Sequence, residues 1–167
     1  FKPDNPRVLY AAKQSSGNSQ IFRSTDGGAN WANISSGMLS SRYRPLIAVT
    51  PENPNVIYAL FSAADYGYHG LYKSTDAGDS WVLQSNTPNI LGRETDGNGT
   101  GGQSWYDLSL GVAPNNENLV YVGGINLWRS DDGGVNWDVD GSSGNSNNYS
   151  YMHVDQHALE FSPHTNI

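Results

Sequence analysis

The residues most suited to chemistry stand at alternate positions near the end of the sequence, in the run from His153 to His157. If this run is an extended strand, alternate side chains share one face, so His153, Asp155 and His157 point the same way. Two imidazoles and a carboxylate can bind a divalent metal ion, or the carboxylate can orient a histidine that acts as acid or base. A hydrogen-bonded structural network and ligand contact are the alternatives. We expect no resident cofactor, with the metal ion as the alternative.

A second group of candidates lies earlier in the chain and suits carbohydrate chemistry. Glycoside hydrolysis needs two carboxyl groups flanking the scissile bond, about 5–5.5 Å apart for retention and about 6.5–9.5 Å for inversion. Asp107 and Asp155 are the catalytic pair that the sequence offers first, with Asp65 in reserve. Because aromatic rings stack on sugar faces, Trp105 and Tyr106 are candidates for glycan binding, and their burial between layers of the fold is the alternative.

A repetitive fold must position these residues, because one phrase occurs three times. Each copy fits Ser-x-Asp-x-Gly-x-x-Trp, and its tryptophans are 50 and 56 residues apart. The aspartate can accept hydrogen bonds from the N–H groups of a tight turn, the glycine can supply a positive φ, and the tryptophan can bury its ring. The residues to which we assign these structural roles are Asp26, Gly28, Trp31, Asp76, Gly78, Trp81, Asp132, Gly134 and Trp137.

Each copy follows a second recurring phrase, found at Pro3–Tyr10, Pro51–Tyr58 and Pro114–Tyr121. The phrase begins with turn-forming residues and ends with apolar residues that favour strands. Together the phrases predict four short antiparallel strands in about 50 residues, which is the period of a β-propeller blade. The expected fold is therefore all-β: a β-propeller segment of four-stranded blades, about three blades plus one strand, and part of a larger propeller.

The repeats make the whole chain, residues 1–167, one partial propeller domain. Blade 1 covers about 1–38, blade 2 about 39–88, blade 3 about 103–142, and the start of a fourth blade about 151–167. The first blade is expected to lack its innermost strand and the fourth its last three. Since propellers close with roughly 4 to 8 blades, the remaining blades of the same propeller are expected partners.

The three copies of the turn resemble the Asp-box, or BNR, repeat, whose members include sialidases, xyloglucan-degrading glycoside hydrolases and sortilin-type receptors. The combined phrases, among them Pro51–Tyr58 followed by Lys73–Trp81, look most like large secreted propeller proteins of Bacteroidota described as glycosyl hydrolases. The resemblance implies a secreted or cell-surface protein. It also implies that the Asp-box turns are structural hairpins, remote from the ligand.

If the Asp-box turns mark one face of the propeller, ligands belong on the opposite face, where the long irregular loops lead into each inner strand. Aligning the repeats brings these loops to equivalent places, so their polar and aromatic side chains are expected to converge on one mouth around Asp107 and Asp155. The candidates for ligand contact are Arg42, Arg44, Trp105, Tyr106, His153 and His157. A further loop, Glu94–Thr100, offers oxygen ligands at calcium-loop-like spacing, with a solvated loop as the preferred alternative.

Composition limits the partners. A formal net charge of −7 without clustered Lys or Arg argues against nucleic acid, and no run of 18 apolar residues predicts a membrane span. The absence of cysteine excludes disulfides and thiolate sites. The expected function is that of a secreted or cell-surface module that binds a glycan or protein ligand, without catalysis by this segment. The alternatives are a glycoside hydrolase acting on a polysaccharide and a purely structural spacer.

Overall fold

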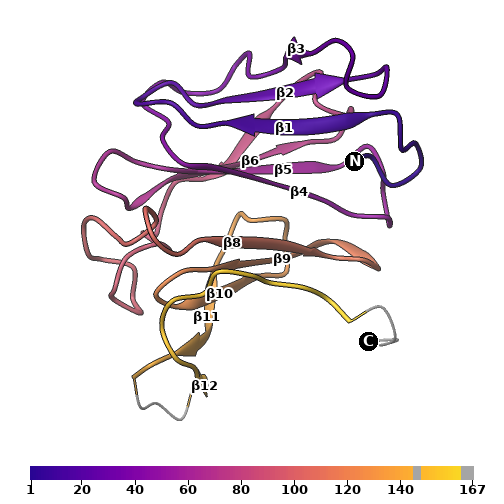
Figure 1. Ribbon diagram of the computed structural model, residues 1–167. Helices are drawn as coiled ribbons and strands as arrows, with labels where there is room; N and C mark the ends of the chain where they lie inside the picture. The colour runs from indigo at the N-terminus through magenta and orange to yellow at the C-terminus, as the bar shows by residue number, and fades with distance from the viewer. Residues whose placement is uncertain (145–147, 163–167) are drawn as a thin grey trace.

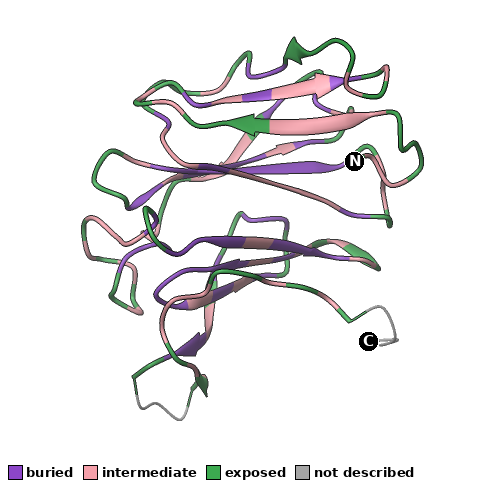
Figure 2. Cartoon of the chain, viewed as in Figure 1, coloured by how far each residue is buried: buried purple, intermediate pink, exposed green. Residues whose placement is uncertain are grey.

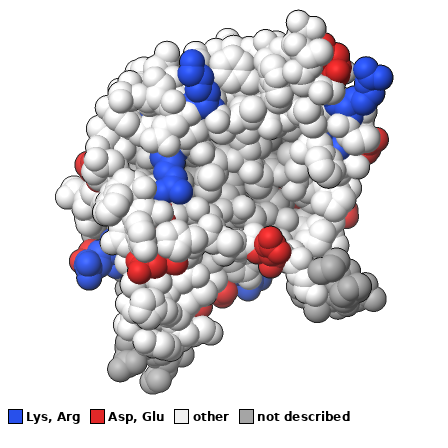
Figure 3. All heavy atoms as spheres, viewed as in Figure 1, with Lys and Arg blue, Asp and Glu red and all other residues white. Residues whose placement is uncertain are grey.

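The structure is a computed structural model that describes residues 1–144 and 148–162. The regular elements of these residues are β-strands in three sheets, which lie one above another in Figure 1. The described ranges contain no helix with the length and apolar character of a membrane span. On the face drawn in Figure 3, Lys and Arg are scattered among uncharged residues and do not form a patch.

The middle sheet has four antiparallel strands in sequence order. They are β4 (Pro45–Val49), β5 (Ile57–Ser62), β6 (Tyr68–Ser74) and β7 (Val82–Ser85). The turn between β4 and β5 is closed by the Val56 N–H, which donates to the Asn53 carbonyl at 2.9 Å, and by the Asn53 side chain, which accepts from the Asn55 N–H at 3.2 Å. Asn53 therefore stabilises the turn, as expected for a turn-forming residue of the recurring phrase.

The first sheet has three strands, β1 (Leu9–Lys13), β2 (Gln20–Ser24) and β3 (Ala32–Asn33). The third sheet contains β8 (Ser109–Ala113), β9 (Asn116–Gly123), β10 (Leu127–Ser130), β11 (Asp138–Ser142) and β12 (Ser150–Tyr151). The last of these pairs parallel to β11, with Tyr151 opposite Ser142. Tyr151, the first residue of the predicted fourth blade, is therefore hydrogen-bonded in the third sheet. Residues 163–167 of that predicted blade lie outside the described residues.

One register recurs in all three sheets and shows which strands are equivalent. The tyrosine of each apolar phrase faces a basic residue of the next strand: Tyr10 faces Arg23, Tyr58 faces Lys73, and Tyr121 faces Arg129. Strands β1, β5 and β9 are therefore the second strands of successive blades. In the described residues, the first sheet has no counterpart of the inner strands β4 and β8. The predicted fold, a β-propeller segment of repeated four-stranded blades, is confirmed.

The core lies between the blades rather than within them. One cluster, centred on Tyr58, Leu71 and Trp128, fills the space between the second and third sheets. Another, centred on Ile21, Phe61 and Tyr72, fills the space between the first and second. The central strand β5 is buried along its whole length (Figure 2), because neighbouring sheets cover both of its faces.

Candidate functional site

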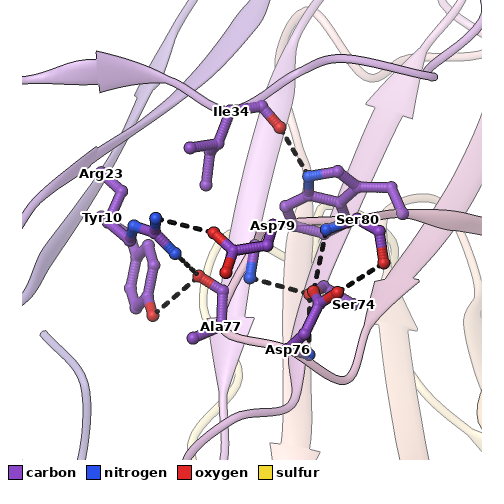
Figure 4. A network of polar contacts seen from close by, with 10 residues as sticks. Tyr10, Arg23, Ile34, Ser74, Asp76, Ala77, Asp79 and Ser80 are labelled. Carbon is purple, nitrogen blue, oxygen red and sulfur yellow. Dashed lines mark hydrogen bonds and ion pairs between the residues drawn. The ribbon is translucent and has the colours of Figure 1, made fainter.

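The three Ser-x-Asp-x-Gly-x-x-Trp turns, which we call the Asp-box turns after the repeat they resemble, are hydrogen-bonded hairpins on one face of the blades. In the second turn, the Asp76 carboxylate accepts from the Ser74 hydroxyl at 2.8 Å, the Ser80 N–H at 2.8 Å and the Ser80 hydroxyl at 2.5 Å (Figure 4). These donors, Ser80 above all, lower the pKa of Asp76 to about 2. Asp26 has the equivalent bonds to Ser24 and Asn30, and the Asn30 N–H lowers its pKa to about 2.

The third turn repeats this arrangement, and all three aspartates are therefore committed to their own hairpins. Partial burial of Asp132 is outweighed by hydrogen bonds from Asn136 and Ser130, so its pKa is also lowered. The two positions with positive φ that follow are held by Gly133 and Gly134, and in the second turn by Ala77 and Gly78. At Gly134, where φ is 88°, a Cβ atom would stand 2.2 Å from Leu71 Cδ2, so a larger residue would strain the backbone and displace the buried Leu71 side chain.

The turns also tie neighbouring blades together. Arg23 of β2 donates to the Ala77 carbonyl at 2.8 Å and pairs with Asp79 at 2.8 Å, while the Tyr10 hydroxyl donates to the same carbonyl at 3.3 Å (Figure 4). The Trp81 indole N–H donates to the Ile34 carbonyl of the first blade at 2.6 Å. This face of the second turn is therefore occupied by contacts with the preceding blade.

The opposite face holds the loop that leads into β8, on the left of Figure 1, and this loop brings two candidate carboxylates together. Gln103 Nε2 donates to Asp107 Oδ2 at 3.2 Å and to Asp155 Oδ1 at 2.7 Å. Residues 103–107 form a tight turn, since the Gln103 carbonyl accepts from the N–H groups of Tyr106 at 2.8 Å and Asp107 at 3.2 Å. The side-chain amide of Gln103 therefore lies between the two carboxylates.

Asp107 is the unusual member of this pair. It is 1% exposed, and burial is the main cause that raises its pKa, with the nearby Asp155 adding to the effect and Gln103 and His157 opposing it. Its second oxygen, Oδ1, finds no hydrogen-bond partner in the described part of the protein, and the hydroxyls of Ser104 and Ser109 share this condition. A buried carboxyl with a free oxygen holds a proton more readily than an exposed one.

Beside these carboxylates lies an exposed aromatic group formed by Trp105, Tyr106 and His157, which we call the aromatic shelf. The Trp105 and Tyr106 rings are 5.5 Å apart, and the Tyr106 ring meets His157 edge-on at 4.7 Å. Trp105 is 63% exposed and Tyr106 48% exposed, so the blades present in this segment do not bury these rings. Their faces are available to solvent and to a ligand.

The two candidate arginines have different positions. Arg42 is 5% exposed and donates to the carbonyls of Ser19 at 3.1 Å and Met38 at 2.9 Å, and also to that of Leu39. The structure therefore does not bring Arg42 to the mouth, because its N–H groups already bond backbone carbonyls around the loop. Arg44 donates to the Ser104 carbonyl at 2.6 Å and thereby holds the turn that carries the aromatic shelf.

The run from His153 to His157 is not a strand, so the expected alternation of its side chains is wrong. No ladder hydrogen bonds hold these residues in a sheet, and Asp155 has a φ of 74°, which turns the chain. His153 instead contacts the Val154 carbonyl through Nδ1 at 2.9 Å. Among the described residues, no three His, Cys, Asp or Glu side chains are grouped so as to hold a metal ion.

The remaining acidic candidates hold loops. Asp65 accepts from the N–H groups of Gly67 at 3.1 Å and Gly101 at 2.9 Å, so it fastens one long loop to the next. Asp96 accepts from the N–H and the side chain of Asn98, each at 3.0 Å. Gln103, which joins Asp107 to Asp155, was not among the sequence candidates. Its place four residues before Asp107 could have indicated the bond to Asp107, but not the bond to Asp155.

Comparisons with known proteins agree with this architecture. No family model matches the sequence. A xyloglucanase of Hypocrea jecorina (strain QM6a) is 26% identical over 147 residues, which are 81% of this chain and 16% of that protein. The chain thus spans less than a fifth of the length of this relative.

Solved structures give the same picture. The GH74 xyloglucanase from Xanthomonas campestris aligns with a TM-score of 0.58 and 19% identity, over 83% of this chain and 22% of its own. An ancestral GH74 enzyme aligns with a TM-score of 0.54 and 23% identity, over 84% and 17%. YCF48 bound to a D1 peptide aligns with a TM-score of 0.52 and 16% identity, over 83% and 45%. At these identities the likeness shows the fold: the chain is a segment of a β-propeller.

Proposed function

We propose that this chain is part of an extracellular β-propeller that binds a glycan on the face opposite its Asp-box turns. The observation that carries the proposal is the aromatic shelf: Trp105 and Tyr106 are exposed on a turn that Arg44 and Gln103 hold in place. Rings of this kind can stack on the apolar face of a sugar, while the Gln103 amide and the Asp155 carboxylate can bond its hydroxyl groups.

The position of Gln103 favours binding over hydrolysis. A hydrolase needs its two carboxyl groups on either side of the glycosidic bond. Here a single amide nitrogen bonds both Asp107 and Asp155, so the space between these carboxylates is filled by protein. A sugar can lie against this pair, but not between its two members.

The test is affinity gel electrophoresis of the protein in gels that contain xyloglucan, mixed-linkage β-glucan or xylan. We expect slower migration with at least one polysaccharide, and its loss in the double variant Trp105→Ala/Tyr106→Ala. The matched control is Trp31→Ala, which removes an exposed tryptophan from an Asp-box turn and should bind as the parent does. Unchanged migration of the parent in every gel, or unchanged retardation of the double variant, contradicts the proposal.

A second candidate function is glycoside hydrolysis, favoured by the raised pKa of Asp107 and by the xyloglucanases among the similar proteins. In that function Asp107 is the general acid, and the Gln103 amide leaves the space between the carboxylates when substrate binds. Release of reducing ends from xyloglucan, abolished by Asp107→Asn, would establish hydrolysis in place of binding alone. The peptide bound to YCF48 makes a D1-like peptide the protein probe to include beside the polysaccharides.

A further inference from the structure

A pocket lies between the loop that follows β7 and the outer edge of the third blade, away from the aromatic shelf. It has a volume of about 480 Å³, and Pro88, Asp96, Trp128, Asp138 and Tyr149 are among the residues that line it. This volume falls within the range of about 300–1,000 Å³ typical of small-molecule sites. None of the described residues that line it is Lys or Arg.

Comparison of two blades shows why this pocket exists. Tyr72 of the second blade and Trp128 of the third are equivalent, since each follows a leucine on the third strand and pairs with the last strand, at Leu83 and Val139 respectively. In the second blade, the preceding loop reaches the ring, and the Leu39 N–H donates to the Tyr72 hydroxyl at 3.2 Å. In the third blade, the corresponding loop is the one that follows β7. It does not bond the Trp128 ring, and the pocket lies between them.

Trp128 is consequently left with an unmade hydrogen bond. The ring is 2% exposed, and its indole N–H finds no acceptor in the described residues. Leaving a buried donor without a partner costs about 1–3 kcal/mol. Since Trp128 lines the pocket, a ligand acceptor that reaches this N–H after a small shift of the pocket wall would recover part of that cost. The neighbouring Trp137 differs, because its indole N–H donates to the Ser85 hydroxyl at 2.9 Å.

The wall opposite the tryptophans is held in shape by its own hydrogen bonds. The Asn89 N–H donates to the Gly97 carbonyl at 3.0 Å, and the Asn89 side chain bonds the carbonyls of Gly99 at 3.0 Å and Gly101 at 2.8 Å. Asp96 is oriented by Asn98, whose N–H is the main cause that lowers the pKa of that carboxyl, and it is therefore an ionised acceptor at neutral pH. This wall of the pocket does not need to be assembled by a ligand.

These groups select the chemistry of the occupant. The Trp128 N–H requires an acceptor, whereas the carboxylates of Asp96 and Asp138 require donors. An ammonium group has no acceptor for the indole, and an acidic sugar is repelled by two carboxylates. The hydroxyl groups of a neutral sugar supply both an acceptor for the indole N–H and donors for the two carboxylates. The apolar face of the sugar can lie against Pro88 and Tyr149. We propose that this pocket binds a neutral saccharide unit, with Trp128 as donor and Asp96 and Asp138 as acceptors.

This inference does not rest on the proposed function, because it uses no residue of the aromatic shelf. The test is ¹H–¹⁵N NMR of the whole chain, in which each of the five tryptophans gives a separate indole N–H signal. Trp128→Phe assigns the signal of Trp128, and Trp105→Phe assigns that of the shelf. The probes are cellotriose, xylotriose and mannotriose, with trigalacturonic acid and choline as charged counterparts.

We expect at least one neutral trisaccharide to shift the Trp128 signal, and we expect Asp138→Asn to weaken that binding by roughly tenfold. Asp138 is exposed, so its replacement leaves the fold intact. The inference is overturned if no neutral trisaccharide moves the Trp128 signal at tens of millimolar, or if choline or trigalacturonic acid moves it instead. A shift of the Trp105 signal alone overturns this inference while supporting glycan binding at the shelf.

Discussion

Aspartate side chains have opposite environments on the two faces of the blades. On the Asp-box face, Asp76 is exposed but bonded by Ser74 and Ser80, and its pKa is lowered to about 2. On the long-loop face, Asp107 is 1% exposed, one of its oxygens has no partner in the described residues, and its pKa is raised. The repeated carboxylates have all their bonds within the turn, whereas the carboxylate that does not repeat is left with capacity for a ligand or a proton.

The contrast extends to the tryptophans. Trp81 and Trp137 are nearly buried and bond the preceding blade, whereas Trp31 is 43% exposed and bonds only the Gly28 carbonyl of its own turn. Within the described residues, the second and third turns therefore contribute bonds between blades that the first does not.

The largest effect should come from removing an interblade tryptophan. Trp81→Ala is expected to lower the free energy of unfolding by about 3–5 kcal/mol, because it leaves a cavity and frees the Ile34 carbonyl. Trp31→Ala is the matched variant and should cost less than about 1 kcal/mol. Urea unfolding followed by circular dichroism measures both. Equal losses would show that burial by the neighbouring blade does not distinguish the turns.

The next effect separates the two arginines before β4. Arg42→Met should cost about 2–3 kcal/mol, since it removes a buried guanidinium and its bonds to the Ser19 and Met38 carbonyls. Arg44→Met removes one bond to the Ser104 carbonyl and should cost about 1 kcal/mol, while weakening polysaccharide binding by loosening the shelf. Unfolding and gel retardation of both variants test this. Loss of binding in Arg42→Met without loss of stability would return Arg42 to the ligand site.

The pH dependence of stability should distinguish the two kinds of carboxylate. The pKa of Asp76 is lower in the folded state, so its contribution is present above the unfolded value near 4 and is lost as pH falls towards 2. The pKa of Asp107 is higher in the folded state, so its ionisation reduces stability as pH rises above that same unfolded value.

Asp107→Asn is therefore expected to stabilise the protein more at pH 7 than at pH 4, relative to the parent. Asp76→Ala should instead destabilise the protein, lowering the free energy of unfolding by about 1 kcal/mol at pH 7 and by less at low pH. Thermal unfolding at several pH values supplies the comparison. A parallel pH profile for parent and Asp107→Asn would mean that this carboxyl is not perturbed by its burial.

The smallest effect on stability should come from the aromatic shelf. Trp105→Ala is expected to change the free energy of unfolding by no more than about 0.5 kcal/mol, because 63% of the side chain is exposed. Gel retardation by polysaccharide should nevertheless be reduced. A loss of several kcal/mol in urea unfolding would make Trp105 a structural residue instead.

The sequence predicted the fold because its signals were local and repeated. The Asp-box turns and the apolar phrases each specify a turn and a strand by residue type, and three copies in register indicated a blade. The last strand of the third sheet was not predicted, because β12 is two residues long and pairs parallel with a strand from its own blade. Nothing in the apolar pattern of Ser150–Tyr151 specifies that pairing.

The candidate site was predicted only in part. Asp107 and Asp155 do lie together, and Trp105 and Tyr106 are exposed beside them. The bridging amide of Gln103 depends on a contact between residues 52 positions apart, which sequence spacing does not reveal. Arg42 was assigned to the mouth because the repeat alignment places its loop at the same entry as residues 103–107. Its guanidinium is instead buried and bonds the Met38 carbonyl of its own loop and the Ser19 carbonyl between β1 and β2.

The short parallel strand β12 has a consequence for how this molecule meets other chains. An uncovered outer strand presents unpaired N–H and C=O groups, to which a strand of another molecule can add. At the third blade, β12 covers part of the outer edge of β11, because Gly141 pairs with Ser150 and Ser142 pairs with Tyr151. The other outer strands, β3 and β7, are two and four residues long and offer little to pair with. The blades are thus protected at their rims against association through their sheets.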